Sequence, residues 1–120
     1  MVISKYFVEA EFWQCSPACS LQDMDPKTVE ILDQAREIAG IPFMLTSAYR
    51  SATFDKSKGR SGTGAHTLGK AVDIRCYSLQ SRFKIVSALL QAGFKRIGIA
   101  ENFIHADTSD VHTQDVIWLY

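Results

Sequence analysis

The sequence has no long apolar run and no excess of charge of either sign. Its longest apolar runs, such as 41–45 and 116–120, fall far short of the about 20 residues that a membrane-spanning helix needs. Its 13 Lys and Arg residues are balanced by 13 Asp and Glu residues, so no basic field attracts a phosphate backbone or a membrane surface. We therefore expect no membrane helix, and neither nucleic acid nor a membrane as a partner.

Cysteine is also scarce, because the chain has only Cys15, Cys19 and Cys76. Three cysteines are too few for a disulfide framework, although Cys15 and Cys19 could pair in an oxidising compartment. The opening segment MVISKYFVEAEFW has glutamates where a signal peptide would have its apolar stretch. We therefore expect synthesis in the cytoplasm without a signal peptide.

Two segments show the apolar periodicity of helices. The first is predicted over 26–39, where Asp25 is placed to cap the start and Gly40 to end the helix. The second is predicted over 79–92, with Gly93 as its C-terminal stop. Each is long enough to cover one face of a small sheet.

The remaining apolar segments are short and rich in β-branched residues, and they are bounded by turn residues. They predict strands over 42–47, 71–75, 96–100, 103–107 and 116–120, and the polar stretch 57–64 predicts a loop. The gaps between the last strands have the length of hairpins. The pattern therefore predicts one α+β domain spanning 1–120, with a mainly antiparallel sheet and about two helices packed on it.

Two of the three histidines lie near aspartates in segments that are otherwise apolar or rich in glycine. His66 and Asp73 lie in AHTLGKAVDI, where a turn at Gly69 could bring both side chains together. His105 lies in the predicted strand FIHAD. A catalytic zinc typically has about three protein ligands, and two histidines with one aspartate fit that set. Spacing alone also allows hydrogen-bonded structural pairs.

Several strings in this order resemble the M15 zinc peptidase family, in its D-Ala-D-Ala carboxypeptidase-like branch. They are TSAYRS, SGTGAHTLGKAVDI, GIAENFIHAD and the ending VIWLY, and the earlier segments EAEFWQC, MDP and GIPFMLTSAYRS also match. The resemblance covers nearly the whole chain. It implies a hedgehog-like or D-Ala-D-Ala-peptidase-like α+β fold with zinc as the cofactor. It also implies that His66, Asp73 and His105 are the metal ligands.

The same resemblance implies a substrate and a place of action. Members of the family cleave bonds next to D-amino acids in bacterial cell-wall peptides, as carboxypeptidases or as endopeptidases of phage lysis and wall turnover. We therefore expect a monomer that hydrolyses peptidoglycan stem peptides and reaches the wall after release or export. The bond that is cleaved stays open.

The resemblance also implies roles for three further residues. Arg50 occupies the arginine of S-x-Y-R and is implied to contact the substrate or the developing oxyanion, which suits a guanidinium. Some branches have an acidic general base three positions before the last histidine, where this chain has Asn102. Glu101 shares the face of His105 on a regular strand, and a single helical turn would also align the two residues. Glu101 is then the candidate base, unless it is a solvated turn carboxylate. Asp107 is expected to orient the His105 ring.

Two alternatives remain. A catalytically silent wall-binding or phage assembly protein could retain the fold, and Asn102 in place of an acid leaves room for this. A cysteine hydrolase could instead use Cys76 with a histidine. His112 lies in a polar stretch between predicted strands, which favours an exposed titrating histidine over a residue that binds substrate or acts as an acid.

Overall fold

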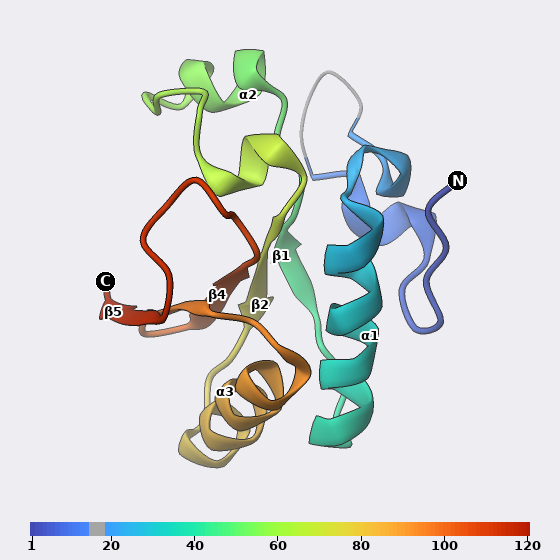
Figure 1. The fold of residues 1–120 in the computed structure, drawn as a ribbon, viewed down its shortest axis with the longest axis vertical. Helices are drawn as coiled ribbons and strands as arrows, with labels where there is room; N and C mark the ends of the chain where they lie inside the picture. Colours follow the sequence, from blue (N-terminus) through green and yellow to red (C-terminus); the bar gives the residue numbers. More distant parts are fainter. Residues whose placement is uncertain (15–18) are drawn as a thin grey trace.

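The computed structural model describes residues 1–14 and 19–120, over which the chain forms a five-stranded sheet with helices (Figure 1). The strands are β1 (Leu45–Ser47), β2 (Ala71–Arg75), β3 (Arg96–Ile99), β4 (Phe103–Asp107) and β5 (Val116–Leu119). The α-helices are α1 (Pro26–Ala39), α2 (Ala52–Ser57) and α3 (Leu79–Ala92). Short 3-10 helices are η1 (Glu9–Phe12), η2 (Leu21–Asp23) and η3 (Ala65–Leu68). The predicted α+β class is confirmed.

Both long helices have the predicted bounds because their capping signals are local. The Asp25 carboxylate accepts a hydrogen bond from the backbone N–H of Thr28 at the start of α1. Gly40 ends α1 in the left-handed conformation, at φ 69°. Gly93 ends α3 in the same way, at φ 116°.

The sheet order is β1-β2-β4-β3-β5, and its first four strands pair antiparallel. The hairpin expectation is right for β3 and β4 but wrong for β5, which lies parallel to β3 at the sheet edge. The chain between β4 and β5 therefore crosses β3 as a loop, residues 108–115. Local gap lengths cannot distinguish the two arrangements, because the choice of neighbour depends on packing far along the chain.

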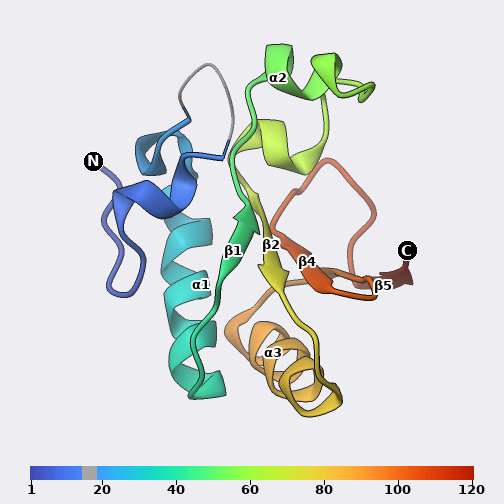
Figure 2. The same cartoon turned by 180° about the vertical axis from the view of Figure 1, so that it is seen from behind.

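One face of the sheet packs on α1 and α3, which also pack against each other (Figures 1 and 2). The buried core joins apolar residues of both helices to alternate residues of the strands; these include Val29, Leu32, Ile85, Leu89, Val72, Ile74, Ile97, Ile104 and Ala106. Because side chains alternate along a strand, the residues between them point to the other face. That other face carries the polar and aromatic side chains considered below.

The segment after β1 differs from the sequence expectation. Residues Ala52–Ser57 form the helix α2, which the sequence did not predict, so the predicted loop 57–64 begins only after Ser57. Ser51 caps the helix by accepting from the N–H of Phe54. A two-turn helix shows too little periodicity to be recognised from sequence. In the part of the chain that the structure describes, no helix is long and apolar enough to span a membrane.

On the face away from α1 and α3, strand pairing aligns one row of residues across the whole sheet. Ser47 pairs with Asp73, Asp73 with His105, His105 with Gly98, and Gly98 with Trp118. A β-bulge between Leu45 and Ser47 in β1 brings Ser47 opposite Asp73. Register alone therefore places a carboxylate beside an imidazole in the middle of the sheet.

Glycine is required at position 98 of this row. A Cβ there would lie 2.7 Å from two ring atoms of Trp118, so the indole lies directly over the Gly98 backbone. This close approach brings the Trp118 ring to 5.3 Å from the His105 ring, measured between centroids. The indole therefore forms a wall beside His105.

Candidate metal centre

The turn at Gly69 brings His66 over the sheet, as the sequence predicts. His66 lies on η3, and Gly69 ends this 3-10 turn in the left-handed conformation at φ 71°. A Cβ at Gly69 would collide with the carbonyl oxygen of Asp23. The N–H of Asp25 also donates to the Gly69 carbonyl, at 2.8 Å. The turn is thereby fixed against the start of α1.

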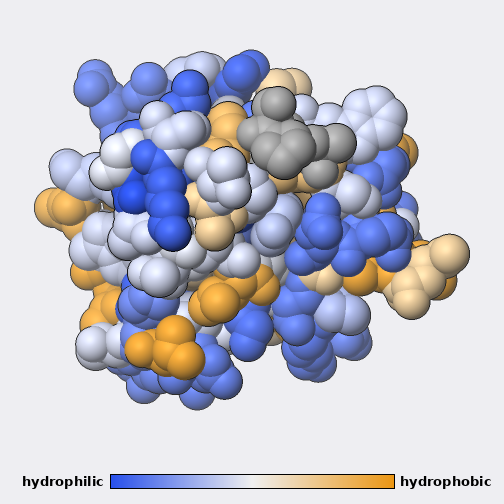
Figure 3. Space-filling model, turned by 90° about the horizontal axis from the view of Figure 1, so that it is seen from above, coloured by the Kyte–Doolittle hydropathy of each residue, from blue (hydrophilic) through white to orange (hydrophobic). Residues whose placement is uncertain are grey.

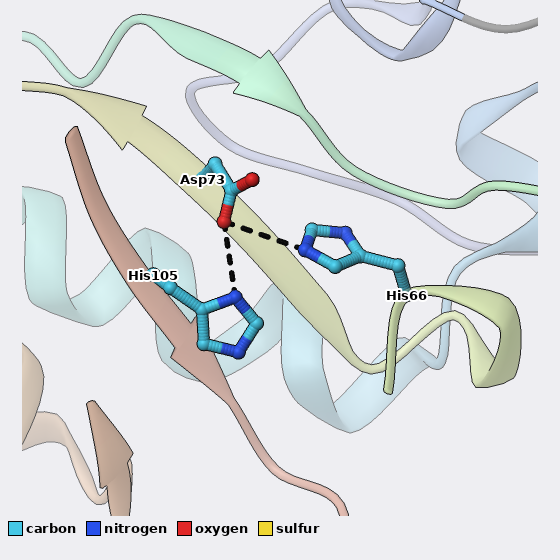
Figure 4. A group of neighbouring side chains, drawn as sticks. All are labelled: His66, Asp73 and His105. Carbon is cyan, nitrogen blue, oxygen red and sulfur yellow. Dashed lines mark hydrogen bonds and ion pairs between the residues drawn. The ribbon is translucent and has the colours of Figure 1, made fainter. Parts of the chain in front are cut away.

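His66, Asp73 and His105 converge from η3, β2 and β4 (Figure 4). One oxygen, Oδ1 of Asp73, lies 3.3 Å from Nε2 of His66 and 3.0 Å from Nδ1 of His105. One ligand atom from each residue lies within 4.8 Å of the others. The structure therefore brings together the three residues that the sequence names as metal ligands.

The other nitrogen of each ring has its own hydrogen-bond acceptor. Nδ1 of His66 lies 2.7 Å from the carbonyl oxygen of Ala48, and a carbonyl can only accept, so this nitrogen carries a hydrogen. Nε2 of His105 lies 2.6 Å from Oδ2 of Asp107, an ionised acceptor. In the neutral rings, Nε2 of His66 and Nδ1 of His105 therefore present lone pairs to Asp73.

Two lone pairs and a carboxylate repel one another unless a cation or extra protons lie between them. This donor set, two imidazole nitrogens and a carboxylate oxygen, is one that zinc accepts, and the fixed outer nitrogens are typical of metal-binding histidines. The residues present therefore fit a zinc ion. The same repulsion explains the protonation of the cluster before a metal binds.

The pKa values of the cluster are shifted accordingly. Burial by itself would raise the pKa of Asp73, but the hydrogen bonds to His105 and His66 outweigh it and hold the pKa well below its usual range. Burial would lower the pKa of His105, but its hydrogen bonds to Asp107 and Asp73 outweigh that effect and raise the pKa. The cluster therefore favours an ionised Asp73 with a protonated His105.

Asp107 is a buried carboxylate with all its partners in place. Its Oδ1 accepts from Nε of Arg96 at 2.8 Å and from the N–H of Ser109 at 3.0 Å, while Oδ2 faces His105. Burial would raise the pKa of Asp107, yet its contact with His105 and those with Ser109 and Arg96 lower it. Both oxygens of Asp107 therefore contact protein groups, and Asp107 lies where it can orient the His105 ring, the role that the sequence leads us to expect.

Arg50 follows β1, close to the cluster. Its Nη1 donates to Oγ of Ser47 at 3.2 Å, and its Nε lies 3.3 Å from Oδ1 of Asp55, an ion pair whose geometry is not that of a hydrogen bond. Burial and the neighbouring Arg60 lower the pKa of Arg50. The buried Asp55 on α2 thus holds the guanidinium, a positioning contact that sequence reasoning missed because α2 was not predicted.

A cavity of about 330 Å³ opens over the cluster. It is lined by Arg50, Arg60, Gly64, Ala65, His66, Asp73, Arg96, Phe103, His105, Asp107, His112, Trp118 and Tyr120. Figure 3 shows the end of the molecule that carries α2, where hydrophilic and apolar side chains are interspersed. The cavity combines cationic groups with an aromatic wall.

The sequence profile of the family described as Peptidase M15 matches residues 5–107. The match includes Arg50 and all three residues of the cluster. The chain belongs to the M15 peptidase family. Peptidases of this family are zinc-dependent hydrolases, in agreement with a cluster that could bind a metal. A search of curated proteins finds no match.

The candidate base that the sequence suggests lies away from the cluster of His66, Asp73 and His105. Glu101 is exposed in the turn before β4, which begins only at Phe103, so the strand placement that would align it with His105 is wrong. It does not line the cavity, and its carbonyl accepts from Arg82 at 3.2 Å. Its role as a base stays a prediction that this placement does not favour.

The alternative of a cysteine hydrolase that uses Cys76 gains no support from the position of this residue. The Cys76 thiol is buried, lies 3.8 Å from the carbonyl of Ser78, and does not line the cavity. Burial raises the pKa of Cys76, the opposite of what a nucleophilic thiolate needs. The pairing of Cys15 with Cys19 stays a prediction, because Cys15 lies outside the described residues.

We expect Asp107→Asn to weaken zinc binding by about 10- to 100-fold, because an amide holds the His105 ring less firmly than a carboxylate does. Added zinc should restore part of any activity. Competition with a chromophoric chelator measures the affinity. Asp110→Asn, an exposed residue of the same loop, is the control. Wild-type affinity in Asp107→Asn would show that Asp107 does not support the ligand.

We expect zinc affinity to fall as the pH is lowered from 8 to 6. The raised pKa of His105 means that the ring keeps its proton to a higher pH than an unperturbed imidazole does, and zinc must displace that proton to bind. The affinity should fall by about tenfold per pH unit for each proton displaced. Calorimetry in buffers of different ionisation enthalpy counts these protons. An affinity independent of pH would contradict this protonation.

Proposed function

We propose that this M15 family member is a zinc-dependent peptidase that hydrolyses peptide bonds in the stem peptides of bacterial peptidoglycan. One observation carries the proposal: the imidazoles of His66 and His105 have their outer nitrogens fixed and their inner lone pairs aimed at one oxygen of Asp73. A structural pair of histidine and aspartate does not need this arrangement. A metal site does.

Each residue has a defined task in the proposed reaction. His66, Asp73 and His105 would hold the zinc ion, and Asp107 keeps the His105 ring in the tautomer that can bind it. When bound, zinc supplies Lewis-acid chemistry, which acidifies water and polarises a carbonyl group. Arg50 offers a guanidinium to the negative charge that develops on the carbonyl oxygen, or to a substrate carboxylate.

The charge of the cavity supports an anionic peptide as substrate. Arg50, Arg60 and Arg96 line it, and only Arg50 and Arg96 form ion pairs with carboxylates among the described residues. Stem peptides carry several carboxylates, so an unpaired Arg60 at the rim suits them. This supports the substrate class and leaves the cleaved bond open.

The aromatic side chains of the cavity support the binding of a peptide over the cluster. Trp118 lies beside His105, and Tyr120 packs against Phe103 with ring centroids 5.1 Å apart. Arg96 lies over the Trp118 ring, 5.0 Å from its centroid. Such a wall excludes water from one side of the reacting carbonyl.

The proposal also covers the oligomeric state of the protein and its place of action. It would act as a monomer on the cell wall, after release or export from the cytoplasm, for instance during phage-type lysis. The rival is a catalytically silent wall-binding or phage assembly protein. The intact cluster and its supporting hydrogen bonds argue against loss of activity, because a silent protein has no need of them.

Mass analysis of defined muropeptides tests the proposal. The zinc-loaded chain should release a stem-peptide fragment or a terminal D-amino acid, and chelation followed by zinc addition should abolish and restore that release. A mass shift also identifies the bond. Zinc-loaded protein that binds peptidoglycan without releasing any product would support the silent alternative instead.

We expect Arg50→Ala to lower turnover by about 100-fold or more while the zinc content stays at the wild-type level, because Arg50 contacts no ligand atom. The same muropeptide assay and elemental analysis measure the two quantities. Arg75→Ala, an exposed arginine of β2 outside the cavity, is the matched control. Near-normal turnover of folded Arg50→Ala would remove Arg50 from the site.

A further inference from the structure

The cavity has few groups that can take up a proton at neutral pH. Asp73, His66 and His105 form the metal cluster, and both oxygens of Asp107 already accept hydrogen bonds from protein groups. Among the described residues that line the cavity, His112 is the one remaining side chain of this kind. Hydrolysis of an amide needs such a group, because a proton must pass from water to the leaving nitrogen.

His112 is held by a scaffold built into the loop between β4 and β5. Its Nδ1 lies 2.6 Å from Oγ of Ser109, a fully buried residue whose N–H is bonded to Asp107. Gln114 Nε2 donates to the carbonyls of Ser109 and His112, at 2.6 and 2.9 Å. Arg96, through Nη1, donates to the carbonyl of Thr113 at 2.6 Å. An ordinary surface histidine has no such support.

The scaffold leaves one ring nitrogen available. When Ser109 Oγ accepts from Nδ1, the neutral ring has its lone pair on Nε2, which has no hydrogen-bond partner within residues 1–14 and 19–120. The hydroxyl can accept from Nδ1 in both the neutral and the protonated ring. His112 can therefore gain and lose a proton at Nε2 without breaking this contact.

The charged groups around His112 come from several elements. Asp107 of β4 and Arg96 of β3 form an ion pair at 2.8 Å, and Asp110 of the loop itself faces Lys70 at 3.7 Å. Arg60, His66, His105 and Tyr120 share the cavity. These two carboxylates thus have cationic partners of their own.

We propose that His112 is the proton-transfer residue of the peptidase, an inference that rests on the proposed function. Nε2 takes a proton from the attacking water as the water oxygen bonds to the carbonyl carbon. The C–N bond then breaks, and Nε2 returns the proton to the leaving amine nitrogen. Water is thus divided between a new carboxyl group and a new amine.

The family match does not assign this role, because it ends at Asp107 and His112 lies beyond it. The competing candidate from the sequence is Glu101. It lies in the turn before β4 and outside the cavity lining. Ser109, by contrast, acts through His112 and is a positioning residue.

The test compares His112→Gln and Glu101→Gln in the full zinc-loaded chain, with Val111→Gln as the matched control. Val111 is an exposed neighbour of His112 and does not line the cavity. His112→Gln should keep wild-type zinc affinity and change KM by less than about threefold, yet lose about 100- to 10,000-fold in kcat. The fall in kcat towards acidic pH that the wild type shows should be absent from the pH profile of His112→Gln. Ser109→Ala should lower kcat less and keep that fall.

A second measurement does not depend on activity. Long-range ¹H–¹⁵N spectra of the zinc-loaded protein above pH 8 should show His112 with its hydrogen on Nδ1, and Ser109→Ala should lose that preference. The Nε2–H tautomer in the wild type would overturn the proposal, because Nε2 would then have no lone pair. A kcat loss in Glu101→Gln as large as that in His112→Gln would also overturn it. If the wild type cleaves no muropeptide, the proposed function fails and the tautomer still decides this inference.

Discussion

The pairing of Asp73 with His105 across β2 and β4 is the constraint on which the site depends. In an antiparallel pair, a shift of register by one residue would turn one of these side chains to the opposite face of the sheet. The register is held by the apolar neighbours Val72, Ile74 and Ile104, which are buried against α1 and α3. The hydrophobic core therefore sets the geometry of the polar face.

On the polar face of the sheet, the side chains that this register brings together form a chain of alternating charge. Asp73 faces His105, His105 faces Asp107, and Asp107 faces Arg96, each within hydrogen-bond distance. Removing one member of a buried set of this kind leaves its neighbour without compensation, which is costly. The same chain supplies the proper tautomer to His105 and, through Ser109, anchors the loop that carries His112. Metal binding and proton transfer thus share one scaffold.

Much of the fold follows from local signals in the sequence. The bounds of α1 and α3 agree with the prediction because Asp25, Gly40 and Gly93 act within one turn of the helix ends. The structure brings His66, Asp73 and His105 together. Their role as metal ligands stays a prediction, because the residues alone allowed structural pairs and only the family resemblance favoured a metal. A pattern of one or two residues does not identify the kind of site when several kinds of site contain the same residues.

The sequence predictions that differ from the structure depend on contacts between segments that are distant in the sequence. Glu101 was placed on the strand with His105, but the chain turns before Phe103. His112 was interpreted as an exposed histidine, because nothing near it in sequence shows that Ser109 is buried beside Asp107. The parallel pairing of β5 was missed for the same reason. Strand neighbours and loop anchors are decided by packing, which periodicity does not report.

A crystal structure of the zinc-soaked protein, with anomalous differences recorded at the zinc edge, tests the central claim most directly. The account predicts one peak bound by Nε2 of His66, the Asp73 carboxylate and Nδ1 of His105, with Nε2 of His105 still bonded to Asp107. A zinc ion bound through Nε2 of His105, with Asp107 displaced, would contradict it. So would a peak elsewhere in the chain with none at these three residues.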